Sequence, residues 1–215
     1  MDHIWSISND RKYDIVTYAF FDFDETITSR DTFIGFIYFN FSRFRVIVGY
    51  LVNGLHILAW HLGLLSTAGI KERLITHFFK GMSENEFKER AQRYGREFIP
   101  TVVLPQARER IKWHQEQGHT VVVVSASLQD YLAQWCQEQK VELLCTRLLF
   151  VNEMVTGKSD GADCSSDEKA RRIKESYDLE SADYVYAYGN SSDDEAMLAL
   201  ADEAYYQSFT EVREK

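Results

Sequence analysis

Asp22 and Asp24 stand one residue apart at the end of an apolar, aromatic run, in the stretch FFDFDETITSRDTF that covers residues 20–33. Side chains at positions i and i+2 of a strand point to the same face, and just past a strand end the chain can turn both toward one cavity. One carboxylate can then attack an electrophile and carry a covalent intermediate while the other transfers protons. This division of roles is typical of aspartyl-phosphate chemistry.

Two further polar clusters follow apolar runs later in the chain. Ser125 and Ser127 end HTVVVVSAS, residues 190–194 follow ADYVYAYG, and Lys169 lies between these clusters in a segment that begins DEKARR. A phosphoryl group in transfer spreads negative charge over its oxygens. It therefore requires a lysine, hydroxyl and main-chain N–H donors, and a divalent cation bound by oxygen ligands. The three clusters and the lysine predict a site for phosphoryl transfer.

Each of these residues also has a structural interpretation when it is taken alone. An Asp after a strand usually caps a helix or forms a turn, Ser125 fits a helix cap, and Lys169 fits a solvated surface. The occurrence of all of them where strands are expected to end favours the chemical interpretation.

Residues from about 100 onward alternate between helical and strand patterns. The stretch QARERIKWHQEQG is amphipathic and ends at Gly118, and HTVVVVSAS is the nearly continuous apolar run of a buried parallel strand. Further strands are expected in VELLCTRLLFVNEMVTG, with a turn at Asn152, and in ADYVYAYG. Between them lies the helical SSDEKARRIKESYDL, capped by Ser165 or Ser166. With a first strand in VTYAFFDFD, this alternation predicts an α/β fold with a Rossmann-like parallel sheet that binds ligands at the carboxyl ends of its strands.

A helical block separates the first predicted strand from the others. Residues 32–99 show no strand pattern and include IKERLITHFFKG, which stops at Gly81, and SENEFKERAQRYGREF. In the second of these stretches Ser83 precedes Glu86 by three residues, as in a capping box. We predict an α/β core made of residues 1–31 and 100–215, interrupted by an all-helical insertion of residues 32–99.

Residues 46–70 are an unusually apolar part of this insertion. The stretch VIVGYLVNGLHILAWHLGLLSTAGI contains no Asp, Glu, Lys or Arg, and about 18 such residues are enough to suggest a transmembrane helix. Asn53, His56 and His61, several glycines and the charged segment that follows argue against a single span. We expect a buried helical hairpin, keep contact with a membrane surface as the alternative, and rank a single span last.

Composition limits the partners and the compartment. The 215 residues are 45% hydrophobic, which is ample for a core, and the net charge of −9 argues against nucleic acid as a partner. Three cysteines without CxxC spacing make a disulfide framework or a zinc site unexpected and fit a reducing cytosol. The first residues, MDHIWSISNDRKYD, lack the pattern of a secretory signal, so we expect a short polar arm. These features predict a cytoplasmic protein and leave its oligomeric state open.

In combination, the motifs resemble those of the haloacid dehalogenase (HAD) superfamily of phosphohydrolases, in its phosphoserine-phosphatase-like branch. DFDET at residues 22–26 resembles the first motif, DxDx[T], and VVVVSAS resembles the second. Lys169 in DEKARR resembles the third motif, and YGNSSDDEAML resembles the fourth, GDSxxDxxML. The resemblance implies a HAD fold of subfamily IB with a C1-type helical cap after the first motif. It also implies hydrolysis of a small phosphomonoester through an aspartyl phosphate.

The resemblance assigns a role to each motif residue. Asp22 is the implied nucleophile, and Asp24 is the implied acid that protonates the leaving alcohol and then activates water. The implied phosphate ligands are Thr26, Ser125, the main-chain N–H of Ala126, and Lys169.

Magnesium is the cofactor that the resemblance implies. Its implied ligands lie in the first and fourth motifs and are Asp22, the main-chain carbonyl of Phe23, Asp24, Asn190 and Asp194. The fourth motif departs from the family pattern, because Asn190 stands where an acid usually follows Gly189. We expect Asn190 to bind the cation directly through its amide oxygen, Asp194 to bind it directly or through water with Asp193 close by, and the affinity to be weaker in consequence.

The cap determines the substrate in this family. Asp31 and Arg73 fall near the acid and the arginine with which phosphoserine phosphatases hold their substrate, but they fit a helix cap and an exposed charge equally well. The uncharged, aromatic part of the cap instead favours an amphiphilic leaving group. A lipid-phosphate phosphatase of phosphatidylglycerophosphate or lysophospholipid type, peripheral to the inner face of a membrane, is therefore the alternative. A degenerate, non-catalytic phosphate-binding protein is a third interpretation because of Asn190.

Overall fold

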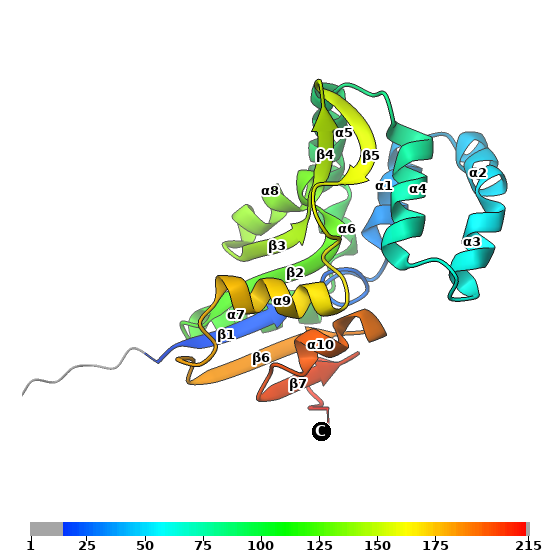
Figure 1. Ribbon diagram of the computed structural model, residues 1–215. Coiled ribbons are helices and arrows are strands. Elements are labelled where there is room, and N and C mark those ends of the chain that lie inside the picture. The colour runs from blue at the N-terminus through cyan, green and yellow to red at the C-terminus, as the bar shows by residue number, and fades with distance from the viewer. Residues whose placement is uncertain (1–14, 214–215) are drawn as a thin grey trace, which may run out of the picture.

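The computed structural model describes residues 15–213, so the polar arm predicted for residues 1–14 lies outside the described range. At its centre is a five-stranded sheet in which every neighbouring pair is parallel, as the sequence pattern predicts (Figure 1). The strands, in spatial order, are β3 (Glu142–Thr146), β2 (Thr120–Leu128), β1 (Thr17–Phe21), β6 (Tyr184–Gly189) and β7 (Glu203–Tyr206). The edge strand β7 has only four residues, and we did not expect it from the sequence.

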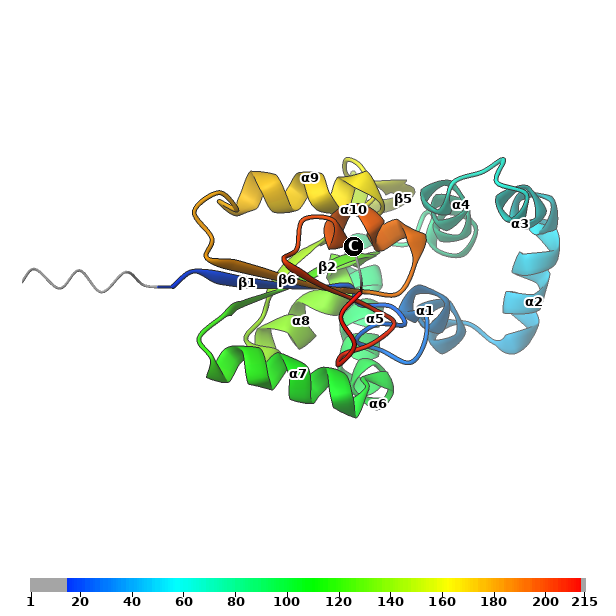
Figure 2. The ribbon, with the colours of Figure 1, turned by 90° about the horizontal axis from the view of Figure 1, so that it is seen from below.

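The sheet lies between two helical layers, and successive strand residues face opposite layers. In β1, Ala19 and Phe21 pack into one hydrophobic cluster while Phe20 packs into the other. Helices α7 (Pro105–Glu116) and α8 (Gln129–Gln139) lie on one side of the sheet, and α9 (Asp167–Ser176) and α10 (Glu195–Leu198) lie on the other (Figure 2). Because both faces are covered, the central strands are apolar on both faces, which explains their continuous apolar runs.

The chain between β1 and β2 forms helices only, which confirms the predicted helical insertion in an α/β fold. After α1 (Thr32–Asn40) come α2 (Arg43–Val52), α3 (Gly54–His61), α4 (Thr67–Phe79), α5 (Glu84–Glu97) and the short α6 (Ile99–Val102) that precedes α7. Ser83 caps α5 as predicted, because its hydroxyl accepts a hydrogen bond from the Glu86 N–H at 3.2 Å. Helices α2–α4 project beyond the carboxyl ends of the strands, whereas α5 packs against α8 of the core (Figure 1). The boundary of the cap at residue 99 therefore stays a prediction.

A β-hairpin from the second half of the chain also contacts the cap. Strands β4 (Leu148–Val151) and β5 (Met154–Ser159) are joined by the predicted turn, where Asn152 and Glu153 have φ angles of 49° and 59°. These left-handed values suit the tight turns that connect hairpin strands. β5 packs against α4, with the Gly157 carbonyl accepting a hydrogen bond from the Thr76 hydroxyl at 3.4 Å. The cap is thus supported by a hairpin that the sequence pattern did not place there.

Residues 46–70 are helical, as predicted, but they do not form the buried hairpin that we expected. Helix α2 ends near Asn53, and α3 follows at once as a short helix in which no residue is buried. Only Val46 and Gly49 of α2 are buried, so most of the apolar side chains in these two helices face outward. Across residues 15–213, none of the helices combines the length and apolar character that crossing a membrane requires.

Candidate active site

Asp22 lies directly after β1, where the chain makes a tight turn. Its main-chain N–H donates to the Tyr188 carbonyl of the neighbouring β6 at 2.9 Å, which continues the ladder by one residue. Glu25 then adopts a left-handed φ of 59°, and the chain folds back so that the Ile27 and Thr28 N–H groups reach the Phe23 carbonyl at 2.9 and 3.0 Å. This turn fixes the first motif at the carboxyl end of the central strand, where ligands of parallel sheets bind.

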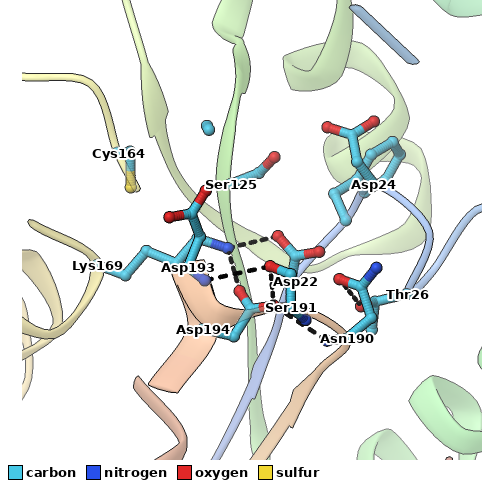
Figure 3. Close-up of polar contacts among 12 residues, drawn as sticks. Asp22, Asp24, Thr26, Ser125, Cys164, Lys169, Asn190, Ser191, Asp193 and Asp194 are labelled. Atoms are coloured by element: carbon cyan, nitrogen blue, oxygen red, sulfur yellow. Dashed lines mark hydrogen bonds and ion pairs between the residues drawn. The ribbon is translucent and has the colours of Figure 1, made fainter. Parts of the chain in front are cut away.

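Lys169 in α9 is buried between two carboxylates (Figure 3). Its ammonium donates to Oδ1 of Asp22 and, at 2.7 Å, to Oδ1 of Asp194, and the residue is only 2% exposed. Burial alone would lower the pKa of Lys169, but the charges of Asp22 and Asp194 outweigh burial and hold the pKa above its ordinary value. Lys169 is therefore a fixed positive charge at the carboxyl edge of the sheet. The alternative interpretation, a solvated lysine on the surface, does not hold.

Only one of the two carboxylate oxygens of Asp22 is hydrogen-bonded within residues 15–213. Its Oδ1 binds Lys169, whereas Oδ2 accepts no hydrogen bond from any side chain or main-chain group in residues 15–213. Burial raises the pKa of Asp22 to about 7; Lys169 opposes this rise, while the negative charges of Asp194 and Asp24 add to it. The local charge is thus dominated by carboxylates that one ammonium does not balance.

Asp194 organises the loop of the fourth motif. Its Oδ2 accepts hydrogen bonds from the N–H groups of Asn190 and Ser191, both at 3.0 Å, and from the Ser191 hydroxyl at 3.1 Å. A Cβ on Gly189 would lie 2.5 Å from the Cβ of Asp194, so this close approach requires glycine. Both oxygens of Asp194 accept hydrogen bonds and the residue is fully buried, so Asp194 positions Lys169 and the loop, and its expected role as a metal ligand, directly or through water, stays a prediction.

Asp24 is held by the first residue of the cap and by the second motif. Its Oδ1 accepts from the main-chain N–H of Thr32 at 2.6 Å and from the Thr32 hydroxyl at 2.5 Å, and its Oδ2 accepts from the Ser127 hydroxyl at 2.5 Å. The Tyr131 hydroxyl in turn donates to Ser127 at 2.8 Å. Asp22 is hydrogen-bonded to Lys169 and Asp24 to Thr32 and Ser127, so the two acids have separate environments.

Asp22, Asp24 and Lys169 line a cavity of about 460 Å³ between the sheet edge and the cap. This volume lies within the range of small-ligand sites. The core contributes polar groups, among them Asp22, Asp24 and Lys169, whereas the cap contributes mainly apolar side chains such as Tyr50, Ile57 and Trp60. The cavity therefore combines a charged floor with an apolar wall.

The predicted phosphate ligands divide into two groups. Lys169 and Ala126 line the cavity. Thr26 and Ser125 are not among its lining residues, because the Thr26 hydroxyl donates to the Asn190 amide oxygen at 3.3 Å and the Ser125 hydroxyl accepts the Ser127 N–H at 3.0 Å. Both residues are buried and support the loops, so the expectation that Thr26 and Ser125 contact phosphate stays a prediction. Ser127, which the sequence analysis grouped with Ser125, reaches the cavity instead.

Asp31 and Arg73, the predicted substrate residues of the cap, lie in different places. Asp31 caps α1 by accepting the Ile34 N–H at 2.8 Å, and it also lines the cavity, so its two interpretations are compatible. Arg73 is exposed and does not line the cavity. The reason is helical geometry: Ile70 and Lys71 face the cavity, and Arg73 lies about 200° around the helix from Lys71.

Lys71 is a site residue that the sequence analysis missed. Its ammonium donates to the Ala126 carbonyl at 2.6 Å and to Oδ1 of Asp163 at 2.7 Å, and the residue is buried at the cavity wall. It thereby ties α4 of the cap to the second motif, near the end of β2, and to the segment before α9. One feature of the sequence could have indicated this role: Lys71 is the first charged residue after the uncharged segment 46–70, and it stands two residues before Arg73, which we had chosen instead.

A comparison with known protein families matches most of the chain. The family of haloacid dehalogenase-like hydrolases matches residues 19–199, which include all four motifs and the cap. The chain belongs to this family. As a HAD-like hydrolase, it has the expected parallel core with a helical cap.

Solved structures place the fold of the chain near that of phosphoserine phosphatases. Protein CicA of Caulobacter vibrioides is 27% identical over 197 residues, a match that spans 88% of this chain and 85% of CicA. A Bordetella pertussis Tohama I protein of unknown function has a TM-score of 0.72 at 17% identity, with 88% and 89% of the two chains covered. A phosphoserine phosphatase with a phospho-aspartyl intermediate analogue has a TM-score of 0.63 at 18% identity and covers 88% of this chain and 85% of its own. Similarity at this level shows the fold alone.

The donors of this HAD-like site fit a divalent cation only in part. No group of three or more His, Cys, Asp or Glu side chains within residues 15–213 is arranged to hold a metal ion. The Phe23 carbonyl does not fit the ligand role that we expected, because it already accepts from the Ile27 and Thr28 N–H groups and from the Thr28 hydroxyl. Among the implied ligand residues, the oxygens that remain for a cation are Oδ2 of Asp22, the Asn190 amide oxygen and the main-chain oxygen of Asp24, and the Asp193 carboxylate lines the same cavity. Oxygen donors next to uncompensated carboxylates suit magnesium, which usually keeps several waters.

Proposed function

We propose that this protein is a magnesium-dependent phosphatase that hydrolyses a small phosphomonoester through an aspartyl phosphate on Asp22. The observation that carries the proposal is the position of Asp22, which lines the cavity and whose Oδ2 accepts no hydrogen bond from residues 15–213 while Lys169 holds Oδ1. A carboxylate oxygen held beside a fixed ammonium is suited to attack an electrophile that itself bears negative charge. The family assignment makes hydrolysis the expected outcome of such an attack.

The proposed first step forms the bond between Oδ2 of Asp22 and phosphorus, and it breaks the bond from phosphorus to the alcohol oxygen. Asp24, which lines the same cavity, supplies the proton that the leaving oxygen takes up. In the second step Asp24 accepts a proton from water as the water oxygen attacks phosphorus, and Asp22 leaves as a carboxylate. The balance is one water consumed, with one alcohol and one phosphate released.

The groups around Asp22 would hold the phosphoryl oxygens during both steps. Lys169 supplies a permanent charge, and the main-chain N–H of Ala126 is the proposed donor from the second motif. Thr26 and Ser125 support these groups from behind, through Asn190 and Ser127 respectively.

Magnesium, when bound, would neutralise charge on the phosphoryl oxygens. The proposed ligands are Asp22, Asn190 and Asp24. Asp24 would act through its main-chain oxygen, because its carboxylate is engaged by Thr32 and Ser127. Within residues 15–213 that main-chain oxygen accepts no hydrogen bond of its own.

A substrate screen with matched variants tests this function. The wild-type protein, Asp22→Asn and Asp24→Asn are compared on phosphorylated metabolites and on short-chain lipid phosphates, with magnesium and with a chelator. We expect Asp22→Asn to lose at least about a thousandfold in kcat, as removal of a nucleophile does. Asp24→Asn should lose roughly a hundredfold or more because general acid–base catalysis contributes about that much.

The exposed carboxylate of Asp160, changed to Asn, serves as the control and should leave kcat unchanged. Circular dichroism spectra of all variants would show that the fold is kept. Wild-type activity in the Asp22→Asn protein would refute the covalent mechanism, and activity that is insensitive to the chelator would refute the metal. If the wild-type protein turns over no phosphomonoester but still binds phosphate, the degenerate, non-catalytic interpretation replaces this one.

A further inference from the structure

Helices α2 and α3 carry the largest group of exposed apolar side chains in the described residues. Of the 17 large apolar side chains exposed within residues 15–213, eleven lie between positions 38 and 64. Six of these expose between 64% and 81% of their surface: Phe44, Leu51, Val52, Leu55, Leu62 and Leu64. We call these six residues the apolar face. Exposed apolar side chains that are gathered in one segment, and not scattered singly, favour a site of interaction.

The charge of this region is opposite in sign to that of the whole protein. Residues 32–71 contain no Asp or Glu, and their charged residues are Arg43, Arg45 and Lys71, although the chain as a whole carries a net charge of −9. Arg43 and Arg45 lie on α2 beside Phe44, and both are exposed. Apolar side chains accompanied only by positive charge match the surface of a bilayer that contains anionic lipid.

The same two helices also form the apolar wall of the cavity. Tyr50 of α2 and Ile57 and Trp60 of α3 line the cavity above Asp22, while their neighbours Leu51 and Leu55 face the outside. Trp60 is the link between the two sides, because it lines the cavity and is itself 38% exposed. A molecule with its phosphate at Asp22 and a long apolar chain along this wall would therefore reach the apolar face.

A second copy of the chain is a poorer occupant of the apolar face. In a symmetric dimer the same surface of each copy meets the other, so Arg43 and Arg45 would face a surface that carries no acidic residue. Like charges placed across an interface disfavour association. An anionic bilayer pairs with both the apolar side chains and the arginines.

We infer that α2 and α3 dock on an anionic lipid surface and deliver to the cavity a phosphomonoester whose alcohol carries an acyl chain. This inference rests on the proposed phosphatase function for its substrate and on the apolar face for its docking. The acyl chain lies against Tyr50, Ile57 and Trp60, and the phosphate lies on the charged floor of the cavity. The family assignment does not specify either point.

Flotation with lipid vesicles tests the docking without any use of activity. The full chain is mixed with vesicles of phosphatidylcholine alone or of phosphatidylcholine with phosphatidylglycerol, and the floating fraction is measured. We expect the wild-type protein to float at least tenfold more with the anionic vesicles and to lose this difference at high salt. Absence of flotation with anionic vesicles would overturn the inference.

Matched variants assign the binding to the apolar face. Leu51→Glu with Leu55→Glu places two charges on the apolar face, one on each helix. Val151→Glu places one charge on β4, where the valine is 50% exposed outside the face. The double variant should lose vesicle binding at least tenfold, and the Val151→Glu protein should bind as the wild type does. Equal flotation of all three proteins would overturn the assignment. A wild-type dimer in solution that the double variant converts to a monomer, with no vesicle binding by either, would replace the bilayer by a second copy.

A pair of substrates that differ only in one acyl chain tests the substrate class. Glycerol 3-phosphate and 1-oleoyl lysophosphatidic acid in mixed micelles are compared by kcat/KM, and we expect the acylated ester to be preferred by at least tenfold. Equal values, or preference for glycerol 3-phosphate, would overturn the substrate class. Vesicle binding without hydrolysis of any phosphomonoester would uphold the docking and refute the phosphatase function, so the two failures are distinguishable.

Discussion

Lys169 on the core side of the cavity is 2% exposed and contacts two carboxylates, whereas α3 on the cap side has no buried residue at all. The core side is fixed by charged hydrogen bonds that converge from β1, α9 and the loop after β6. The cap side is an apolar wall that few contacts hold in place. The difference teaches that the sheet preorganises the proposed catalytic groups, while the part of the cavity proposed to meet the rest of the substrate is free to adapt.

Removal of the Lys169 charge should have the largest effect of the variants considered, because it disrupts the core side of the cavity. In Lys169→Met, the buried carboxylates of Asp22 and Asp194 lose their common partner. We expect kcat to fall by about a hundredfold or more and the free energy of unfolding to fall by about 3 kcal/mol, because buried charges are left without compensation. Turnover of an aryl phosphate and urea denaturation measure the two effects.

Lys174→Met is the matched control, since Lys174 is exposed on the same helix. A Lys169→Met protein as active and as stable as this control would show that the ion pairs are not what fixes the core side.

Replacement of Asn190 by an acid should increase the difference between the two sides of the cavity, because it should strengthen cation binding on the core side. Asn190→Asp restores an acid at the start of the fourth motif and adds a negative charge beside Asp22. We expect magnesium to bind about tenfold more tightly, because ligand charge is a main determinant of the affinity for hard cations. Titration calorimetry in the absence of substrate measures the dissociation constant.

Asn152→Asp, the same chemical change in the exposed turn between β4 and β5, is the control for the added charge. Unchanged or weaker magnesium binding in Asn190→Asp would contradict the proposed ligand role of position 190.

Substitution of Lys71 should distinguish the contribution of the cap side from that of the core side. In Lys71→Met, the cap loses its hydrogen bonds to the Ala126 carbonyl and to Asp163. We expect KM to rise by roughly tenfold with a smaller change in kcat, because closure over the substrate weakens while Asp22 and Lys169 stay in place. Steady-state kinetics on a single phosphomonoester give both constants.

Arg73→Met is the matched control from the outer side of the same helix, and it should change neither constant. An effect of Arg73→Met as large as that of Lys71→Met would restore the role that the sequence resemblance gave to Arg73.

The smallest effect is expected where α2 meets α4. A Cβ on Gly49 would lie 2.3 Å from the Cζ atom of Phe78, whereas a Cβ on Gly54 would meet no atom within 4 Å. Gly49→Ala should therefore lower the free energy of unfolding by about 1–3 kcal/mol through overpacking, and Gly54→Ala should not lower it. Thermal unfolding and limited proteolysis of residues 43–65 measure the effect. Equal stability of the two variants would mean that α2 shifts freely on α4.

The core side of the cavity could be predicted well from the sequence, and the cap side could not. Asp22, Asp24 and Lys169 were found because each belongs to a short motif at the end of a periodic apolar run, and the strands bring those ends together. The hydrogen bonds of Thr26, Ser125 and the Phe23 carbonyl to neighbouring loops were not foreseen, because one hydrogen bond decides whether a group faces the cavity or supports a loop. That choice depends on the turn at Glu25 and on the distance between loops, which no local pattern encodes.

The cap was harder to predict because its apolar residues serve two purposes. Apolar periodicity indicates that a side chain avoids water, but it does not distinguish a buried wall from an exposed docking face. Residues 46–70 were accordingly assigned to helices but placed in the wrong environment. Lys71 and Arg73 differ by two positions, and only the orientation of α4 decides which one reaches the cavity.

The hydrogen bonds from Thr32 to Asp24 have a consequence for engineering of the protein. Thr32 is the first residue of the first cap helix, yet its N–H and hydroxyl hold the proposed acid–base residue. A chimera that exchanges residues 32–99 for the cap of another protein would therefore replace part of the active site together with the cap. Grafts joined after Thr32 should keep turnover, whereas grafts joined before it should succeed only with donors that supply a hydroxyl at this junction.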